Sequence, residues 1–389
     1  MEKEQLITLL AVALGSPRQD TRIRTVSDCL PLAHEHGVAN LLYYALPYLS
    51  ESQQPNEQER KNLKKLAYAA ASREAVQQRE LEALLARFEE ERIRVLPLKG
   101  CVIKQLYPKP DMRYMSDTDL LFNAAQASKV KEIMEELGYI TQKYDQGETD
   151  FYISPTRMNY ELHRSLRDEG FNESSRRFFD ALFSYAKPQH GKEYVLELPE
   201  EEHYAYLLCH FVKHLINGGI GVRQVMDIYF CKCQWSFDEK KLRTLLKELE
   251  LTEFAATLER LAECWFGSGT GDAVTKELGA YILGSGRFGT DAQRVTDRML
   301  REQGNSNRMV YILRRVFLPY QTMAGYFPSL KKAPFLLPFY WVFRLFRGIF
   351  CRKDKLSNEM NTLLGTTEDA LNERAAFYRR CGLKVYEKR

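Results

Sequence analysis

The sequence predicts an α+β protein in which a small mixed sheet with its own helices is flanked by helical N-terminal and C-terminal regions. Residues 56–92 contain no Pro or Gly and are rich in strong helix formers. Residues 93–163, by contrast, hold several short apolar runs separated by turn residues, as strands do. Because 389 residues exceed what one small core accommodates, we expect four regions, with the bounds 1–92, 93–198, 199–302 and 303–389.

The N-terminal region is expected to be entirely helical. Leu6, Leu9, Leu10 and Leu14 recur at helical spacing and predict one buried stripe. The chain starts with the charged run Met-Glu-Lys-Glu-Gln, which is not the pattern of a signal peptide. We interpret this region as a scaffold.

The pattern changes in the second region, which begins with a predicted strand at 93–98. A second strand is expected at 117–122, DTDLLF, and a helix over 125–137 that ends at Gly138. Further strands are predicted at 139–144, 150–154 and 158–163. Together these elements would form a compact α+β unit of roughly 100 residues, which is an ordinary domain size.

Helices return from about residue 200. They are predicted over 200–217, 221–234, 238–249 and 251–265. The Gly-rich stretch 267–271 predicts a turn, because it lacks the preceding strand and following helix of a dinucleotide-binding loop. No Gly-x4-Gly-Lys-Ser/Thr motif occurs in the sequence, which excludes a P-loop nucleotide site.

Charge and cysteine usage narrow the class of protein. The 56 basic and 52 acidic residues leave a net charge of +4, so there is no strong nucleic-acid signal. The eight cysteines are scattered, and the one close pair, Cys231 and Cys233, is a residue short of the Cys-x-x-Cys spacing of metal knuckles. We interpret the cysteines as reduced, mostly buried thiols and expect a cytoplasmic protein.

One apolar stretch, APFLLPFYWVFRLFRGIF at 333–350, was considered as a membrane segment. Pro338, Arg344 and Arg347 interrupt it, so it should not cross a bilayer, and no transmembrane segment is expected. The favoured interpretation is a helix buried against its own protein. The alternative is peripheral contact with an anionic membrane surface through residues 333–353.

The candidate chemistry begins with Asp117 and Asp119. They are two residues apart on a predicted strand, so both side chains leave the same face. Adjacent carboxylates repel each other, and a divalent cation relieves that repulsion. Mg²⁺ prefers oxygen ligands and commonly binds one or two carboxylates together with substrate phosphates. The pair therefore predicts a Mg²⁺ site.

A later strand carries Glu161 and, two residues on, His163. A third carboxylate on a neighbouring strand would complete a site for two ions, as phosphoryl-type transfer uses. The alternative is a solvent-facing Glu161 on an edge strand.

Basic residues that could bind phosphates lie between the first strand and the two aspartates. Lys99, Lys104 and Arg113 are the candidates. Gly100 would permit close backbone approach, and a helix that begins there would direct free N–H groups at an anion.

The run LPLKGCVIKQLYPKPDMRYMSDTDLLF followed by NYELH resembles the uncharacterised nucleotidyltransferase family of the polymerase-β-like superfamily. The later segment HYAYLLCHFVKHLINGGIGVRQVMDIYF resembles the helical part of that family, and the similarity covers roughly residues 35–300. The resemblance implies that Asp117 and Asp119 bind Mg²⁺ and that Glu161 is the third acid of the metal site or the base.

The same resemblance places Gly100 and Cys101 where the wider superfamily has Gly-Ser at the nucleotide triphosphate. Here Cys101 replaces the usual Ser, and residues 102–116 make a long loop. These departures make the triphosphate contact less defined than the metal site.

A second cluster lies on the predicted helix at 200–217. His210 and His214 have the i, i+4 spacing that can ligate zinc, but no third ligand is evident, and a polar face lining a cleft is the alternative. Arg223 and Asp227 are also four residues apart and are predicted to pair. With His163, these four residues are the candidates for the acceptor side of the site.

The predicted function is transfer of a nucleoside monophosphate from a Mg²⁺-bound NTP to a small-molecule or protein acceptor. Two Mg²⁺ ions are expected, and ATP is the expected nucleotide. The alternative is a non-catalytic nucleotide-binding or antitoxin-like regulatory module with the same fold. Turnover with Mg²⁺-NTP separates the two hypotheses.

Overall fold

A computed structural model of the chain describes residues 2–16, 25–287, 289–302, 317–351 and 365–384. The chain divides into two compact units. The first contains residues 1–215 and 220–287, and the second contains residues 216–219 and 288–389. Each unit is described by itself, and the four-region division remains a prediction.

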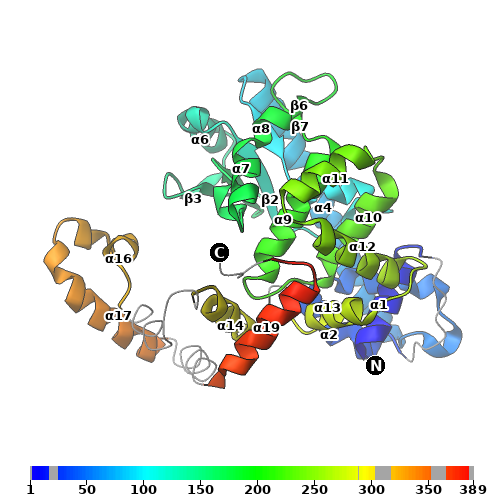
Figure 1. The fold of residues 1–389 in the computed structure, drawn as a ribbon. Helices are drawn as coiled ribbons and strands as arrows, with labels where there is room; N and C mark the ends of the chain where they lie inside the picture. Colours follow the sequence, from blue (N-terminus) through cyan, green and yellow to red (C-terminus); the bar gives the residue numbers. More distant parts are fainter. Residues whose placement is uncertain (1, 17–24, 288, 303–316, 352–364, 385–389) are drawn as a thin grey trace. The chain divides into compact units, whose positions relative to one another are not determined.

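The first unit contains a mixed five-stranded sheet, which confirms the predicted α+β fold with helical flanks (Figure 1). Its strand order is β1-β2-β5-β4-β3. Strands β2 and β5 run parallel, and the other neighbours are antiparallel. The bounds are β1 Val95–Pro97, β2 Asp117–Phe122, β3 Ile140–Lys143, β4 Thr149–Ile153 and β5 Asn159–His163. The first and last residues of each strand lie within about two residues of the predicted bounds.

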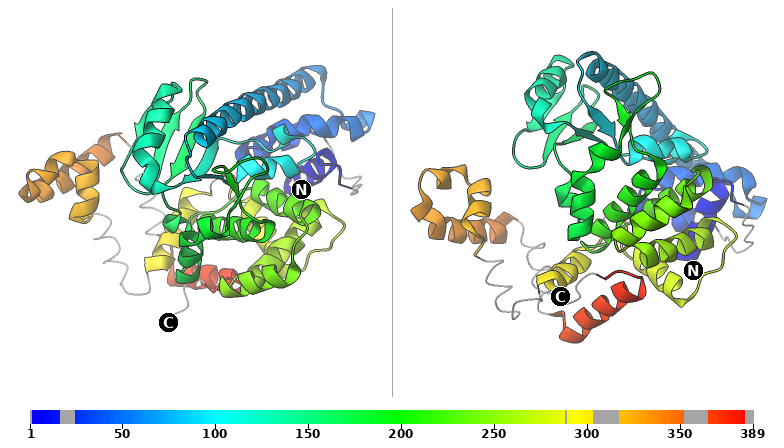
Figure 2. Two further views of the ribbon diagram at one scale, coloured as in Figure 1. Left: turned by 90° about the horizontal axis from the view of Figure 1, so that it is seen from above. Right: turned by 45° about the horizontal axis from the view of Figure 1, so that its top comes forward.

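One face of this sheet is packed by two helices, α4 (Glu57–Glu90) and α6 (Ala127–Glu136) (Figure 2). Strand residues of one parity, including Leu120, Tyr152 and Tyr160, point into this shared core. Residues of the other parity leave the opposite face. That alternation keeps Asp117, Asp119 and Glu161 out of the apolar core.

The N-terminal helices are stabilised by the predicted leucine stripe, whose four members are all buried. The first three helices are α1 Glu2–Ala13, α2 Leu30–His36 and α3 Leu42–Ala45. The long helix α4 begins at an Asn56 capping box, in which the Asn56 side chain accepts from the backbone N–H of Glu59.

Helices that follow the sheet complete the first unit. The elements between β5 and this helical layer are the 3₁₀ turn η8 Arg167–Glu169, helices α7 Glu173–Asp180 and α8 Leu182–Tyr185, and a small sheet of β6 Lys187–Pro188 and β7 Leu196–Glu197. The layer itself contains α9 Glu200–Leu215, α10 Val222–Gln234, α11 Glu239–Glu248, α12 Thr252–Phe266 and α13 Ala273–Leu283. The first four of these match the helices predicted from residue 200 onward.

The second unit is helical where it is described. Its helices are α14 Asp291–Glu302, α16 Tyr320–Tyr326, α17 Leu337–Cys351 and α19 Glu368–Arg380. Helices α14 and α19 contact each other, and the hydroxyl of Tyr378 donates to Oδ1 of Asp297 at 2.7 Å. Residues 303–316 and 352–364 of the predicted C-terminal extension lie outside the described residues.

The apolar stretch at 333–350 forms most of α17. In the described parts of the chain, no helix has the length and apolarity that crossing a membrane requires. The favoured interpretation of a buried helix is wrong for one of its faces, because Phe339 and Phe346 there are exposed. The other face packs on α16 and the turn that follows it.

Candidate functional site

Parallel pairing of β2 with β5 brings together Asp119 and Glu161, two of the three acids predicted to bind metal, whereas Asp117 lies opposite Asn159. Asp119 lies opposite Glu161 in the register, and Leu121 lies opposite His163. One ligand atom each of Asp119, Glu161 and His163 lie within 4.8 Å of one another. These three side chains together could hold a metal ion. We call the three residues and the neighbouring Lys99 the Asp119 cluster.

Asp119 is buried, and its carboxylate is held from two sides. Nζ of Lys99 lies 2.9 Å from Oδ1 of Asp119, and Nε2 of His163 lies 3.0 Å from the same oxygen. Burial alone would raise the pKa of Asp119, but the charge of Lys99 and the hydrogen bond with His163 hold it well below its usual value. No described residue donates a hydrogen bond to Oδ2, so this oxygen is available to a ligand.

His163 is oriented by both of its ring nitrogens. The hydroxyl of Thr149 lies 3.0 Å from Nδ1, while Nε2 contacts Asp119. Because the ionised Asp119 carboxylate can only accept, Nε2 donates to it, and Nδ1 shares a hydrogen bond with the hydroxyl of Thr149. This arrangement fixes the Asp119 carboxylate in place.

Glu161 differs from Asp119 because no cation of the described residues pairs directly with its carboxylate, although the charge of Lys99 partly offsets it. Within the described parts of the chain, its carboxylate forms no hydrogen bond and no ion pair. Burial raises the pKa of Glu161, and the neighbouring charges of Asp119 and Asp117 raise it further. A divalent cation would remove this repulsion, and the carboxylate oxygens suit Mg²⁺ or Mn²⁺.

Asp117 lies at the start of β2, half-buried, and accepts from the hydroxyl of Ser116 at 3.0 Å. With Glu161 it lines a hollow of about 430 Å³ over β3, β4 and β5. Lys143, Phe151 and Asn159 also line this hollow. The acids therefore face a space that a ligand can enter.

Lys99 and Gly100 occupy a tightly constrained turn between β1 and α5 (Gly100–Ile103). Lys99 has a φ of +49°, which a residue with a Cβ rarely adopts. A Cβ on Gly100 would lie 2.5 Å from Nη1 of Arg113 and 2.8 Å from Sδ of Met115. The glycine is thus required by packing against these side chains.

Arg113 belongs to a second buried group. Its Nε and Nη2 donate to the two oxygens of Asp227 at 3.0 and 2.7 Å. The hydroxyl of Tyr107 donates to the same carboxylate at 2.7 Å. We call Arg113, Asp227 and Tyr107 the Arg113 cluster. Arg223 instead donates to the backbone oxygen of Tyr114, so the predicted Arg223–Asp227 pair is wrong.

Two other residues expected on the phosphate side lie elsewhere. Nζ of Lys104 pairs with Glu74 of α4 at 3.0 Å and is buried. Cys101 lies in the core, where burial raises the pKa of its thiol to about 12, and its Sγ contacts the backbone oxygen of Asp119 at 3.8 Å. Of the predicted basic residues, the structure brings Lys99 directly to the acids.

A group of polar residues on α9 and η8 adjoins Lys99. Nδ1 of His210 donates to Glu169 at 2.6 Å, and Nζ of Lys213 donates to the other oxygen of Glu169 at 2.8 Å. The ring of His214 lies 4.4 Å from the ring of His210, centroid to centroid. His210 therefore contacts both the Glu169 carboxylate and the ring of His214.

Burial and the charge of Lys99 lower the pKa of His210, which places this histidine within electrostatic reach of the Asp119 cluster. Burial also lowers the pKa of His214, to about 3. Sequence reasoning missed Glu169, because nothing in the run Arg-Asp-Glu-Gly distinguishes it from a solvated acidic turn.

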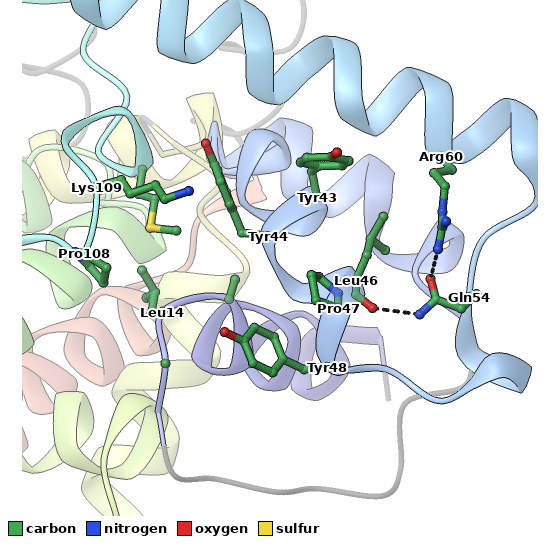
Figure 3. Close-up of a pocket in the computed structure, with 13 residues that line it drawn as sticks. Leu14, Tyr43, Tyr44, Leu46, Pro47, Tyr48, Gln54, Arg60, Pro108 and Lys109 are labelled. Atoms are coloured by element: carbon green, nitrogen blue, oxygen red, sulfur yellow. Dashed lines mark hydrogen bonds between the residues drawn. The ribbon is translucent and has the colours of Figure 1, made fainter.

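A separate hollow of about 770 Å³ lies among the N-terminal helices and the 108–112 loop. Figure 3 shows Tyr43, Tyr44 and Tyr48 around it, together with Arg60 and Lys109. None of the residues of the Asp119 cluster lines this hollow. We therefore locate the candidate chemistry at the sheet.

Comparison with known proteins gives one result. Residues 24–267 match the model of a family described as uncharacterised nucleotidyltransferases. This match contains the whole sheet, the Asp119 cluster and helices α9 to α12. No curated protein and no solved structure matches the chain.

Proposed function

Because the chain belongs to this family of uncharacterised nucleotidyltransferases, we propose that it transfers a nucleoside monophosphate from a metal-bound NTP to an acceptor. The observation that carries the proposal is the Asp119 cluster, in which Glu161 remains uncompensated beside Asp119 and His163. The expected nucleotide is ATP, and the expected acceptor is a small molecule or a protein side chain. The near balance of charge over the chain gives no reason to expect a nucleic acid.

In this proposal Asp119 and Glu161 hold one Mg²⁺, and Asp117 contributes to the site of a second. When bound, the ions would neutralise phosphate oxygens and stabilise the charge that develops as pyrophosphate leaves. His163 keeps the Asp119 carboxylate oriented through its contact with Thr149. Lys99 balances the charge of Asp119, and in this proposal its ammonium group also attracts a phosphate of the bound nucleotide.

The nucleotide would occupy the hollow of about 430 Å³ beside Asp117 and Glu161. Phe151 offers an aromatic surface there, and Nζ of Lys143 lies 5.3 Å from the centre of its ring. An aromatic ring with an adjacent cation suits a nucleobase and its phosphates. In this proposal the nucleobase stacks on Phe151, and the phosphates contact Lys143 in the same hollow.

We assign His210 to the acceptor side of the site, where it would act as the general base. As the acceptor oxygen bonds to the α-phosphorus, the bond from that phosphorus to the bridging oxygen of pyrophosphate breaks, and the acceptor hydroxyl loses its proton. Glu169 fixes Nδ1 of His210, whereas Nε2 has no hydrogen-bond partner within the described part of the chain. The lowered pKa keeps His210 neutral at neutral pH, so Nε2 can accept this proton.

A direct experiment is incubation of the protein with each Mg²⁺-NTP and candidate acceptors, followed by mass spectrometry of acceptors and protein. Transfer should add the mass of a nucleoside monophosphate and release pyrophosphate. Asp119→Asn should abolish this product, whereas Asp145→Asn, an exposed carboxylate near the same strands, should leave it unchanged. Turnover that survives Asp119→Asn would contradict the site assignment.

His210 can be tested in the same assay. His210→Gln should lower turnover by about 10²- to 10⁴-fold while Mn²⁺-nucleotide affinity stays unchanged. A base role also predicts that the acidic limb of the pH–rate profile is lost in the variant. The control is His190→Gln, which alters an exposed histidine outside the cluster. An unchanged pH profile in His210→Gln would remove the base assignment.

A non-catalytic nucleotide-binding or regulatory module is the second candidate function. The observation that favours it is that Arg113 and Lys104 are engaged by Asp227 and Glu74, which leaves fewer cations for a triphosphate. This candidate predicts metal-dependent nucleotide binding by calorimetry without pyrophosphate release in the presence of any acceptor tested. Pyrophosphate release that depends on Asp119 would exclude it.

A further inference from the structure

Residues 317–351 of the second unit form a small helical module with its own core. Met323, Ala324 and Leu330 are its buried centre, and one face of α17 packs against them through Leu337, Tyr340 and Trp341. These three residues of α17 recur at helical spacing, so they define its inner face.

The inner face is fixed by hydrogen bonds as well as by packing. Nε1 of Trp341 donates to the backbone oxygen of Leu318 at 2.8 Å, and the hydroxyl of Tyr340 lies 2.7 Å from that of Ser329. The ring of Tyr340 also packs 4.7 Å from that of Phe327, centroid to centroid. These contacts fix the rotation of α17 about its axis.

With its rotation fixed, α17 presents a second apolar face outward. Five apolar side chains lie on this face, the first of them directly before the helix. Their exposed fractions are 79% for Phe335, 62% for Phe339, 52% for Val342, 45% for Phe343 and 57% for Phe346. Phe339, Val342, Phe343 and Phe346 recur at helical spacing, so they make a continuous stripe along one side of α17. Contiguous exposed apolar patches of this kind mark sites of interaction with proteins or membranes. We call these five residues the outer face of α17.

The charge around this stripe has one sign. Residues 317–351 contain no Asp or Glu, and their two lysines are Lys331 and Lys332. Lys331 and Lys332 are exposed in the turn before the stripe begins. An aromatic face with flanking cations and no anions is complementary to an anionic lipid surface, where aromatic rings prefer the interface and lysines attract headgroups.

We propose that the outer face of α17 docks on an anionic lipid bilayer, lying in the headgroup region without crossing it. The length of α17, Leu337–Cys351, is shorter than a bilayer-spanning helix requires. A second copy of the chain is a poorer occupant of this face, because the same basic residues would meet each other across a symmetric contact. The inference concerns where the protein works and is independent of its chemistry.

Co-sedimentation of the full chain with vesicles tests this proposal. Vesicles of equal parts phosphatidylglycerol and phosphatidylcholine should bind the protein, and vesicles of phosphatidylcholine alone should bind it at least about tenfold more weakly. High salt should reduce binding to the anionic vesicles, because it screens the lysines. Absence of binding to the anionic vesicles would overturn the proposal.

Two pairs of variants separate the apolar and charged contributions. Phe339→Ser with Phe346→Ser should weaken binding by about tenfold or more, whereas Ile140→Ser, which alters a residue 53% exposed on β3, should not. Lys331→Glu with Lys332→Glu should weaken binding by a similar factor, whereas Lys64→Glu with Lys65→Glu, an exposed pair on α4, should not.

Analytical ultracentrifugation without vesicles completes the test. The wild-type protein and Phe339→Ser with Phe346→Ser should sediment alike, since the outer face is assigned to lipid. A lower oligomeric state in the double variant would instead show that a second copy covers this face. Equal binding of the wild type, Phe339→Ser with Phe346→Ser, and Lys331→Glu with Lys332→Glu to anionic vesicles would also overturn the proposal.

Discussion

Two groups of buried charge lie beside the sheet, and they differ in whether their charges balance. In the Arg113 cluster, the guanidinium binds both oxygens of Asp227, and Tyr107 donates a further hydrogen bond. The ion pair has one charge of each sign, and both side chains are nearly inaccessible to solvent. Within this pair, neither charge is left without a partner.

The Asp119 cluster has the opposite character. Lys99 balances Asp119, but Glu161 adds a carboxylate that no described residue pairs with. The same side chain lines a hollow, so a cation has a path to it. In the proposed assignment, the half-buried Glu161 carboxylate, which has no direct partner and faces solvent, belongs to the functional site, whereas the closed Arg113–Asp227 pair belongs to the scaffold.

The largest expected effect comes from removing the shared carboxylate of the Asp119 cluster. Asp119→Asn should lower Mn²⁺-nucleotide affinity by about 10- to 100-fold, because it removes the negative charge of a metal ligand that His163 orients. The substitution also leaves Lys99 without its partner, so the fold of the variant must be checked by circular dichroism. Unchanged affinity in a folded Asp119→Asn protein would place the metal elsewhere.

The Arg113 cluster should respond in stability. Asp227→Asn leaves the Arg113 guanidinium buried without a countercharge, which should lower the free energy of unfolding by about 3–5 kcal/mol. Urea unfolding measures this value. The matched control is Glu57→Gln in the exposed pair Lys61–Glu57, for which a change below about 1 kcal/mol is expected. Equal effects of the two substitutions would contradict the scaffold role of Asp227.

A smaller effect is expected from Glu161 in the metal-free protein. Its pKa is raised in the folded state, so its ionised form is disfavoured by folding. The contribution of Glu161 to the free energy of unfolding in EDTA should therefore rise as the pH falls from neutral through its folded-state pKa, and the gain should end below its unfolded pKa. Asp119 contributes with the opposite sign at lower pH, because its pKa is lowered in the folded state, so the contribution of Glu161 has to be isolated with a variant.

Glu161→Gln isolates this contribution. The variant should be more stable than the wild type in EDTA at neutral pH, and the difference should shrink as the pH falls. Unfolding followed over a pH series measures both. A difference that grows on acidification would show that Glu161 is stabilised as the carboxylate, contrary to the account of the cluster.

Strand parity explains why the acids of the site could be predicted from the sequence. Asp117 and Asp119 share one face of a strand because they are two residues apart, and the alternation of apolar and polar residues in 158–163 placed Glu161 and His163 together. Periodicity also gave the strands and the helices from residue 200 onward. These features depend on local spacing, which a single sequence contains.

The partners of buried cations could not be predicted in this way. Arg113 and Asp227 are 114 residues apart, and Lys104 and Glu74 are 30 apart, so their pairing depends on how the helices pack. Four-residue spacing suggested Arg223 for Asp227, but the bidentate geometry of Arg113 occupies that carboxylate. Glu169 was missed because burial, which the sequence does not show, distinguishes it from other surface acids.

The exposed face of α17 was missed for a related reason. The composition of 333–350 indicated an apolar helix, and burial was the favoured interpretation. The short module around Met323 and Leu330 is too small to cover more than one side of the helix. Composition therefore gave the helix correctly, but the number of covered faces depends on the size of the core beside it.

The central claim is that the uncompensated charge of the Asp119 cluster is a metal centre, and Mn²⁺ calorimetry on three proteins tests it most directly. The wild type and Glu74→Gln, which breaks the Lys104–Glu74 pair on α4, should bind Mn²⁺ with the same affinity. Glu161→Gln removes a charge but no hydrogen bond, and should bind about 10- to 100-fold more weakly. Equal Mn²⁺ affinity in the wild type and Glu161→Gln would contradict the account.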